Sequence, residues 1–328
     1  MQTLIRQTNA FKTFQTEVAN DAHSHAYLIV LDDARNLRET VLTFAKALYG
    51  CDNPYEEDER ILAERIDAGT FSDCRCFPEE GKKFVVDDAE LLTEESYLMP
   101  VESNKKVFVV TDFAEANVAS QNKLLKLLEE PPFGVVFLLG ATTSFSVLPT
   151  VLSRVSKLEI PPFPETSIVN ALKRAYPTGY KQEDFTLCAV ASGGSVGTAQ
   201  TMLEGGEYRA LIADAFALCL ARKDKLPMLV KKIGETKRKK QLLFLLRVIF
   251  RDATLIKGGL SANGYMLLQA EQDNVVAVAN AFSLSTLVYA QEKITQAEMD
   301  VYFNAVFPQC IELLFADLFA HQEKYRDL

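Results

Sequence analysis

One segment of the chain lies where nucleotide-binding proteins place a phosphate loop. Residues 25–31, HAYLIVL, form an apolar run of strand length, and a helical pattern begins at about Leu37. A phosphate loop at this junction needs glycines for close backbone approach, a lysine for the terminal phosphates and a hydroxyl for Mg²⁺. From Leu31 the sequence reads LDDARNLR, without glycine, with Leu37 at the lysine position and Arg38 at the hydroxyl position. We therefore expect no ATP binding and no cofactor here.

Other residue types that could do chemistry lack the spacing that the chemistry needs. No Ser–His–Asp or Cys–His arrangement forms around His23, His25 or His321. Cys74 and Cys76 are separated by one residue, which is tighter than the paired spacing of structural zinc sites. We expect buried, reduced thiols and no metal site.

Alternating strand and helix patterns must position these residues. Three apolar runs, residues 25–31, 105–112 and 134–143, have strand length, and the shorter runs FSDCRCF (71–77) and KFVV (83–86) are also expected to be strands. Helical patterns lie between them. Strands that are apolar on both faces are typical of parallel sheets, so we predict an α/β fold with a parallel sheet covered by helices.

At about residue 161 the alternation of strand and helix patterns ends. PPFPE (161–165) predicts a short, stiff connector, and small helical patterns and a glycine-rich turn follow. From residue 208 onwards the sequence is almost entirely helical in pattern. Its apolar content exceeds what one thin stripe needs, which indicates a bundle core or a partner.

Composition narrows the class of protein. The 328 residues are 48% hydrophobic and carry a net charge of −9, which argues against a surface that binds nucleic acid over its whole extent. The net charge does not exclude a basic patch on one part of the surface. No secretory leader and no apolar run of transmembrane length occurs, so we expect a cytoplasmic protein without a membrane partner.

Five segments together carry a family resemblance. HAYL (25–28), Thr111-Asp112 after a strand, NKLLKLLEEPP (122–132), LPTVLSR (148–154) and GGSVGTA (193–199) closely resemble the delta-prime subunits of bacterial DNA polymerase III, members of the AAA+ clamp-loader family. The resemblance covers most of residues 23–205. It implies a RecA-like AAA+ domain without a functional Walker A loop (1–162), a helical lid (163–207) and a helical collar that holds the loader together (208–328).

The resemblance also implies that two further parts of the ATP site have been lost. In working ATPases of the family, the strand before the leucine-rich helix ends in Asp-Glu, and here Thr111 replaces the metal-linked aspartate. Asp112 alone is expected to serve as a residue near a helix N-terminus. The sensor-2 arginine is replaced by Thr198. Many relatives also carry a four-cysteine zinc module, and only Cys51, Cys74 and Cys76 occur in that region.

One catalytic role remains. In the family, the Ser-Arg segment supplies an arginine finger to ATP in the neighbouring subunit, which assigns this role in trans to Arg154. The usual cysteine after this pair is Val155 here. Ser153, Asn122, Glu129 and Glu130 are assigned to the subunit interface or to the geometry of the signature helix.

The function implied is that of a non-hydrolysing clamp-loader subunit. Its expected partners are gamma/tau and delta subunits, with the sliding clamp and primed DNA contacted through the complex. Two alternatives stay open: an ATP-hydrolysing gamma/tau-type subunit, and a stand-alone scaffold or DNA-binding protein with the same fold. The basic run KKIGETKRKK (231–240) is either a solvated helix face or a contact for DNA or an acidic protein, and no aromatic residues interleave with its lysines.

Overall fold

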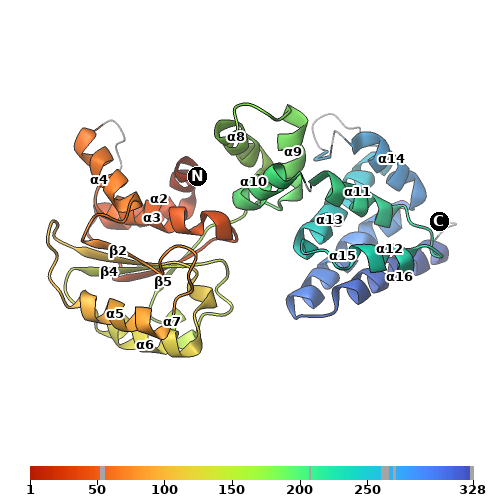
Figure 1. Ribbon diagram of the computed structural model, residues 1–328. Coiled ribbons are helices and arrows are strands. Elements are labelled where there is room, and N and C mark those ends of the chain that lie inside the picture. The colour runs from red at the N-terminus through yellow and green to blue at the C-terminus, as the bar shows by residue number, and fades with distance from the viewer. Residues whose placement is uncertain (52–55, 207, 260–265, 269–270, 326–328) are drawn as a thin grey trace. The chain divides into compact units, whose positions relative to one another are not determined.

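A computed structural model describes residues 1–51, 56–206, 208–259, 266–268 and 271–325. They form two compact units, Met1–Phe163 and Pro164–Leu328. The elements of the first unit, which is drawn in Figure 1, are α1 (Gln2–Gln7), α2 (Asn9–Ala19), β1 (Ala26–Val30), η1 (Ala34–Asn36), α3 (Leu37–Leu48), α4 (Glu57–Asp67), β2 (Cys74–Phe77), α5 (Val86–Ser96), β3 (Lys106–Val110), η2 (Phe113–Glu115), α6 (Val118–Glu129), β4 (Val135–Ala141), α7 (Pro149–Leu152) and β5 (Ser156–Glu159).

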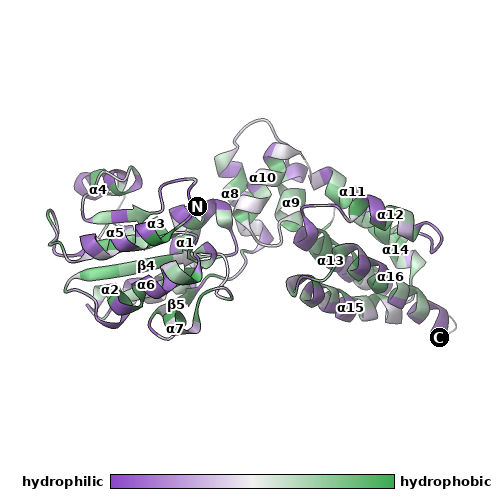
Figure 2. Ribbon diagram, turned by 60° about the horizontal axis from the view of Figure 1, so that its bottom comes forward, coloured by the Kyte–Doolittle hydropathy of each residue, from purple (hydrophilic) through white to green (hydrophobic). Residues whose placement is uncertain are grey.

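The first unit is built on a five-stranded sheet in the order β2-β3-β4-β1-β5, and every pairing is parallel. Helices α2 and α3 cover one face, and α5 and α6 cover the other (Figure 1). All residues of β1, β3 and β4 are buried, and β4 is drawn as strongly apolar in Figure 2. This arrangement confirms the predicted α/β fold with a parallel sheet covered by helices.

A glycine sets how closely α3 approaches the sheet. A side-chain carbon added at Gly140 on β4 would lie 2.6 Å from Cγ2 of Val41 and 3.4 Å from Cγ of Leu37. Only a residue without a side chain lets the start of α3 pack this tightly against β4. The helix that follows the LDDARNLR segment is therefore held directly on the central strands.

The prediction of a strand at KFVV (83–86) is wrong. Residues 82–85 belong to no strand, Val85 has an extended backbone, and Val86 already begins α5. Phe84 is buried and its ring lies 6.3 Å from that of Phe113. The backbone N–H of Val85 donates to Asp88 Oδ2 at 3.0 Å, which fixes the start of the helix. The apolar residues thus anchor a helix entry and do not extend the sheet.

The second unit contains helices only within its described residues. They are α8 (Glu165–Ala175), α9 (Gln182–Ala191), α10 (Val196–Gly205), α11 (Tyr208–Cys219), α12 (Leu226–Ile233), α13 (Lys239–Lys257), α14 (Gln272–Ala281), α15 (Leu284–Tyr302) and α16 (Phe307–Lys324). In this part of the chain, no helix combines the length and the apolarity that crossing a bilayer requires. The further division into lid and collar stays a prediction.

Candidate functional site

The segment in the phosphate-loop position is closed by its own side chains. After β1 the chain makes the short 3₁₀ turn η1, and the backbone N–H of Asn36 donates to Asp33 Oδ1 at 3.2 Å. The Asn36 amide also donates to Asp33 Oδ2 at 2.9 Å. Asp33 is only 3% exposed, so its carboxylate is buried within this turn. This local structure uses the backbone at the start of α3 for an internal turn.

The two residues that replace lysine and hydroxyl have structural contacts. Leu37 is buried and packs beneath Gly140, as described above. Arg38 donates from Nη1 to the carbonyl oxygen of Pro78 at 3.0 Å, which ties α3 to the end of β2.

The end of β3 gives no metal-binding pair. Thr111 is buried, and its hydroxyl donates to the carbonyl oxygen of Phe77 at 3.4 Å. Asp112 adopts the left-handed backbone conformation, with φ of 53°, at the start of η2. Burial, with Glu115 nearby, raises the pKa of the Asp112 carboxyl.

Thr198 has a capping role in the second unit. It lies in the first turn of α10, where its backbone N–H donates to Ser195 Oγ at 3.2 Å. The Ser195 hydroxyl in turn donates to Oγ1 of Thr198 at 2.9 Å. This is an ordinary helix N-cap, formed by the residues of the glycine-rich turn.

Arg154 lies at the edge of the sheet where β5 begins, opposite the edge where β1 and β3 end. It comes just after α7 and just before β5. Its Nε donates to Glu129 Oε1 at 2.9 Å, and Nη2 donates to the same oxygen. Nη1 donates to the carbonyl oxygen of Thr150 at 2.8 Å and to Ser153 Oγ at 2.9 Å. These four contacts occupy most of the N–H donors of the guanidinium. The structure thus brings together three predicted residues, Arg154, Ser153 and Glu129.

The surroundings of Arg154 form an open depression of about 610 Å³. Its lining residues are Ser24, His25, Leu128, Glu129, Ser153, Arg154, Val155 and Ser156. The side chains of Arg154 and Glu129 are 32% and 49% exposed. An ion pair this exposed contributes only about 0–1 kcal/mol to stability, so a bound anion could displace the carboxylate.

The other two predicted interface residues are not part of this cluster. Asn122 is exposed on α6, and Glu130 is exposed at the end of that helix. Among the described residues, neither makes a hydrogen bond to Arg154 or Ser153. Their assignment to a subunit interface stays a prediction.

Sequence reasoning missed Gln121, which fixes the segment that carries Arg154. Its side chain is buried in α6, and Nε2 donates to the carbonyl oxygens of Ala116 and Ser146 at 3.0 and 3.1 Å. Its Oε1 accepts the backbone N–H of Leu148 at 2.9 Å. An amide on the buried face of a leucine-rich helix was the available signal, because such a group must find partners.

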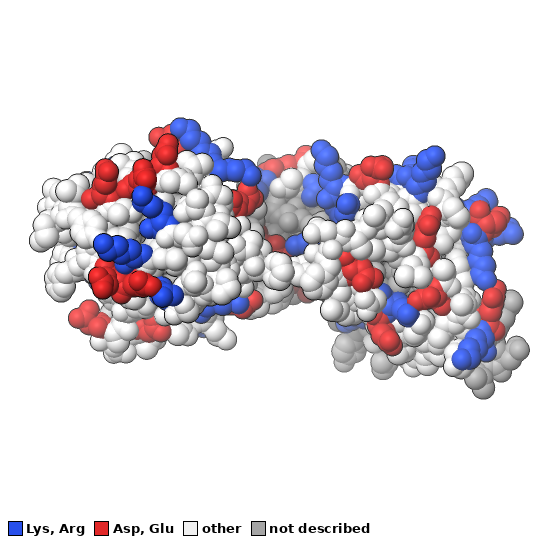
Figure 3. Space-filling view, turned by 90° about the horizontal axis from the view of Figure 1, so that it is seen from below, with Lys and Arg blue, Asp and Glu red and all other residues white. Residues whose placement is uncertain are grey.

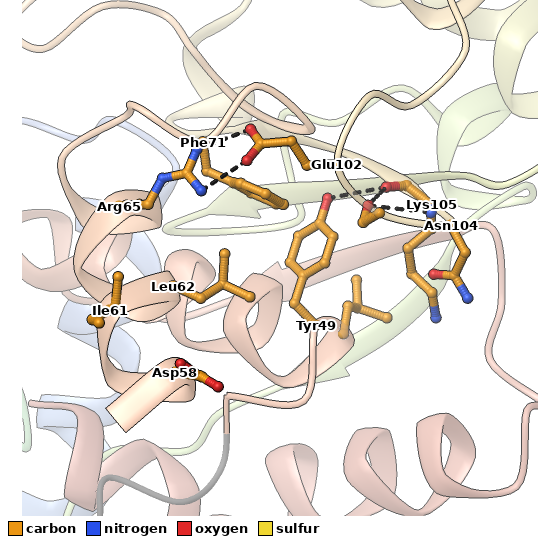
Figure 4. A pocket seen from close by; sticks show the side chains of 11 residues that line it. Tyr49, Asp58, Ile61, Leu62, Arg65, Phe71, Glu102, Asn104 and Lys105 are labelled. Atoms are coloured by element: carbon orange, nitrogen blue, oxygen red, sulfur yellow. Dashed lines mark hydrogen bonds and ion pairs between the residues drawn. The ribbon is translucent and has the colours of Figure 1, made fainter. Parts of the chain in front are cut away.

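The segment between α3 and β2 contributes helix α4, whose residues help to line a pocket. Helix α4 and the 102–105 segment enclose a cavity of about 530 Å³, in which Arg65 donates to both oxygens of Glu102 at 2.8 and 2.9 Å (Figure 4). That pairing lowers the pKa of Glu102 to about 2. Burial raises the pKa of Cys74 to about 12 and that of Cys76 to about 11, which keeps both thiols protonated and poor metal ligands.

Charges on the first unit are mixed. On the face drawn in Figure 3, acidic and basic side chains are interspersed over this unit and are not gathered into one basic field. This distribution agrees with the net charge of −9. The basic run 231–240 lies in the second unit, from the last turn of α12 to the first turn of α13.

Comparison with known proteins connects this geometry to a family. The family model described as DNA polymerase III, delta subunit, matches residues 6–164. The delta-prime subunit of Escherichia coli is 34% identical to this chain, and the match covers 44% of this chain and 43% of that subunit. The delta-prime subunit of Bacillus subtilis is 25% identical, and the match covers 51% of each chain. The gamma/tau subunit of Mycobacterium bovis is 39% identical over 21% of this chain and 12% of its own.

These matches span between 12% and 51% of the length of the relatives. They include delta-prime and gamma/tau subunits alike, so the distinction between the two rests on the residues of the phosphate-loop segment and of the Arg154 cluster. The parallel sheet, the leucine-rich helix α6 and the Ser-Arg segment all lie within the matched part. Through residues 6–164, this chain is similar to DNA polymerase III clamp-loader subunits.

Proposed function

We propose that this chain is a non-hydrolysing, delta-prime-type subunit of the DNA polymerase III clamp loader. It does not hold ATP, and it presents Arg154 to ATP bound by a neighbouring gamma/tau subunit. The observation that carries the proposal is the difference between the two edges of the sheet. The edge where β1 and β3 end is occupied by Asp33, Arg38 and Thr111, whereas the edge where β5 begins carries an exposed, oriented arginine.

The position of Arg154 supports action on another subunit. Strand β1 pairs in parallel with β5, so Arg154 lies beyond the starting edge, and the former phosphate loop lies beyond the ending edge. Five residues of β-strand span roughly 16 Å. A guanidinium at one edge cannot reach a nucleotide at the other within the same chain, so its phosphate must come from outside.

The chemistry of the finger is electrostatic. A planar guanidinium can place two N–H donors against the oxygens of a transferring phosphoryl group, where negative charge is distributed in the transition state. The exposed pair with Glu129 keeps Arg154 directed along the edge without burying it. When a γ-phosphate approaches, it competes with the carboxylate for the same donors.

The first prediction concerns nucleotide binding. The isolated chain is expected to show no ATP binding in the micromolar range, because the Asp33 turn and Leu37 occupy the phosphate-loop position. Isothermal titration with Mg·ATP measures this directly, and an isolated gamma/tau subunit serves as the positive control. Micromolar affinity would support the ATP-hydrolysing gamma/tau-type alternative instead.

A second prediction concerns Glu129. In a reconstituted loader, Glu129→Gln should lower stimulated ATP turnover at the facing site by up to about fivefold, because an exposed pair contributes at most about 1 kcal/mol to orienting Arg154. The KM for ATP should stay unchanged, since the partner binds the nucleotide. Glu64→Gln, which removes an exposed carboxylate from its ion pair with Arg60 on α4, is the matched control and should change neither value.

The two effects should also be coupled. Adding Glu129→Gln to a chain that already carries Arg154→Ala should cause no further loss, because the residue that Glu129 orients is gone. Unchanged or raised turnover in the single Glu129→Gln variant would show that this carboxylate does not position Arg154.

The proposal includes the partners of the complex. Gamma/tau and delta subunits are the expected neighbours, the sliding clamp and primed DNA are contacted through the assembled loader, and the site of action is the cytoplasm. Co-purification with gamma/tau and delta tests this assignment. A chain that fails to associate with either would be a stand-alone scaffold or DNA-binding protein with the same fold.

A further inference from the structure

The carbonyl oxygen of Leu128 loses its usual donors at the end of α6. In a continuing helix, a backbone N–H three or four residues ahead would bond to this oxygen, and here those residues are Pro131 and Pro132. Proline has no backbone N–H, so neither residue can donate. Leu128 is buried, so its carbonyl group needs a donor from elsewhere in the chain.

The side chain of His25 supplies that donor. Its Nε2 lies 2.9 Å from the carbonyl oxygen of Leu128, which is 103 positions away in the sequence. Because a carbonyl oxygen can only accept, the hydrogen of this bond is on Nε2. Histidine side chains can bond to the last carbonyl groups of a helix. His25 thus caps the C-terminal end of α6 from the start of β1.

The backbone around His25 is itself fixed. The carbonyl oxygen of His25 accepts the backbone N–H of Phe137 at 2.8 Å, which continues the pairing of β1 with β4. One residue earlier, the backbone N–H of Ser24 donates to Oη of Tyr27 at 2.7 Å. The bond to Leu128 therefore joins the end of α6 to a strand that is buried throughout.

This contact lies beside the Arg154 cluster. The register of β1 and β5, counted back by two residues, leads to His25 and Arg154. Both residues line the open depression of about 610 Å³. Glu129 directly follows the capped residue Leu128, and its carboxylate accepts from Nε of Arg154 at 2.9 Å. A fixed carbonyl group at Leu128 therefore also fixes the backbone from which the Glu129 side chain extends.

We propose that His25 is a positioning residue for Arg154. It caps α6, the capped end of α6 places Glu129, and Glu129 directs the guanidinium. The inference rests on the proposed function, in which Arg154 acts on ATP in a neighbouring subunit. It also connects two distant segments of the sequence: the prolines of NKLLKLLEEPP (122–132) leave a carbonyl group without a donor, and the histidine of HAYL (25–28) bonds to it.

The first test follows the position of Arg154 in the absence of ATP. In the full chain labelled with nitrogen-15, the Nε–H resonance of Arg154 is identified by its loss in Arg154→Lys. His25→Phe keeps a ring but removes the donor, so the bond from Arg154 to Glu129 should loosen. The Nε–H resonance should then shift, and its exchange with water should become about threefold faster or more. His25→Gln keeps an N–H donor at a similar reach and should retain the parent signal.

The second test measures the consequence in the reconstituted loader. His25→Phe should lower single-turnover hydrolysis at the facing site about threefold, within the roughly fivefold limit for Glu129→Gln, because His25 acts through Glu129. The KM for ATP should not change, and His25→Gln should restore the rate. His23→Phe makes the same substitution at a residue that does not line the depression and should leave the rate unchanged.

The outcomes separate this inference from the proposed function. If Arg154→Ala lowers hydrolysis and His25→Phe does not, His25 does not position the arginine. A raised KM for ATP, or a loss that His25→Gln fails to restore, would also contradict the role, since either points to general damage of the fold. If Arg154→Ala itself has no effect, the proposed function is wrong, and the Nε–H resonance still shows whether His25 positions Arg154. An unchanged resonance in His25→Phe would overturn the inference.

Discussion

Arg154→Ala is expected to lower DNA- and clamp-stimulated ATP hydrolysis at the facing gamma/tau site by about 10³-fold or more, because arginine fingers supplied in trans contribute about 10³–10⁵ in rate. The other ATP sites of the loader keep their own fingers, so total steady-state turnover should fall only by the share of this site. Single-turnover hydrolysis in a reconstituted complex separates the affected site from the others.

The assembly itself should survive this change. Arg154 is an exposed side chain, and its removal should alter the free energy of unfolding by only about 0.5 kcal/mol. Arg154→Lys is the sharper control, since it keeps the charge and loses the planar fork, and we expect little rescue. If an assembled complex that carries Arg154→Ala kept its full stimulated hydrolysis, the assignment of Arg154 as an arginine finger would be wrong.

Asp73→Ala is expected to cause the largest loss of stability among the changes considered. The carboxylate is fully buried and accepts the backbone N–H groups of Val101, Glu102 and Ser103 at 2.7–2.8 Å, and the Ser103 hydroxyl as well. Hydrogen bonds to a charged group contribute about 1.5–3 kcal/mol each, and water can reach part of this exposed loop once the acceptor is gone. We expect a loss of about 2–4 kcal/mol.

Urea unfolding followed by circular dichroism gives this value. The two compact units should be resolved by differential scanning calorimetry, with only the transition of Met1–Phe163 shifted downward. Asp73→Asn keeps one acceptor oxygen and should lose less than Asp73→Ala. An Asp73→Ala protein as stable as the parent would mean that the 101–103 segment does not depend on this carboxylate.

The fold was predictable where burial on both faces left a continuous apolar signal. The runs at 25–31, 105–112 and 134–143 became β1, β3 and β4, and the spacing of Leu37 to Leu48 became α3. Strand β5 was missed because only Leu158 in it is buried, which leaves a short and largely polar edge strand. The strand predicted at KFVV (83–86) was wrong because a short apolar run is equally compatible with the segment that leads into a helix.

The candidate site was predictable in its residue types and less so in its contacts. The absence of glycine in LDDARNLR and the Ser153-Arg154 pair are visible in the sequence itself. The contact between Arg154 and Glu129 joins residues that are 25 positions apart, and no periodic pattern encodes it. The same holds for Gln121, whose three hydrogen bonds depend on how the loops after η2 and β4 approach α6.

The difference between the two edges of the sheet gives the chain a polarity. On the proposed function, this chain supplies an arginine to the next subunit and binds no nucleotide for the previous one to act on. It therefore occupies the first position in the order of subunits within the loader. Two copies placed next to each other would direct Arg154 of one toward a place in the other that Asp33 and Leu37 already fill. On the proposed function, every copy of this arginine faces a phosphate when each loader contains one copy of the chain.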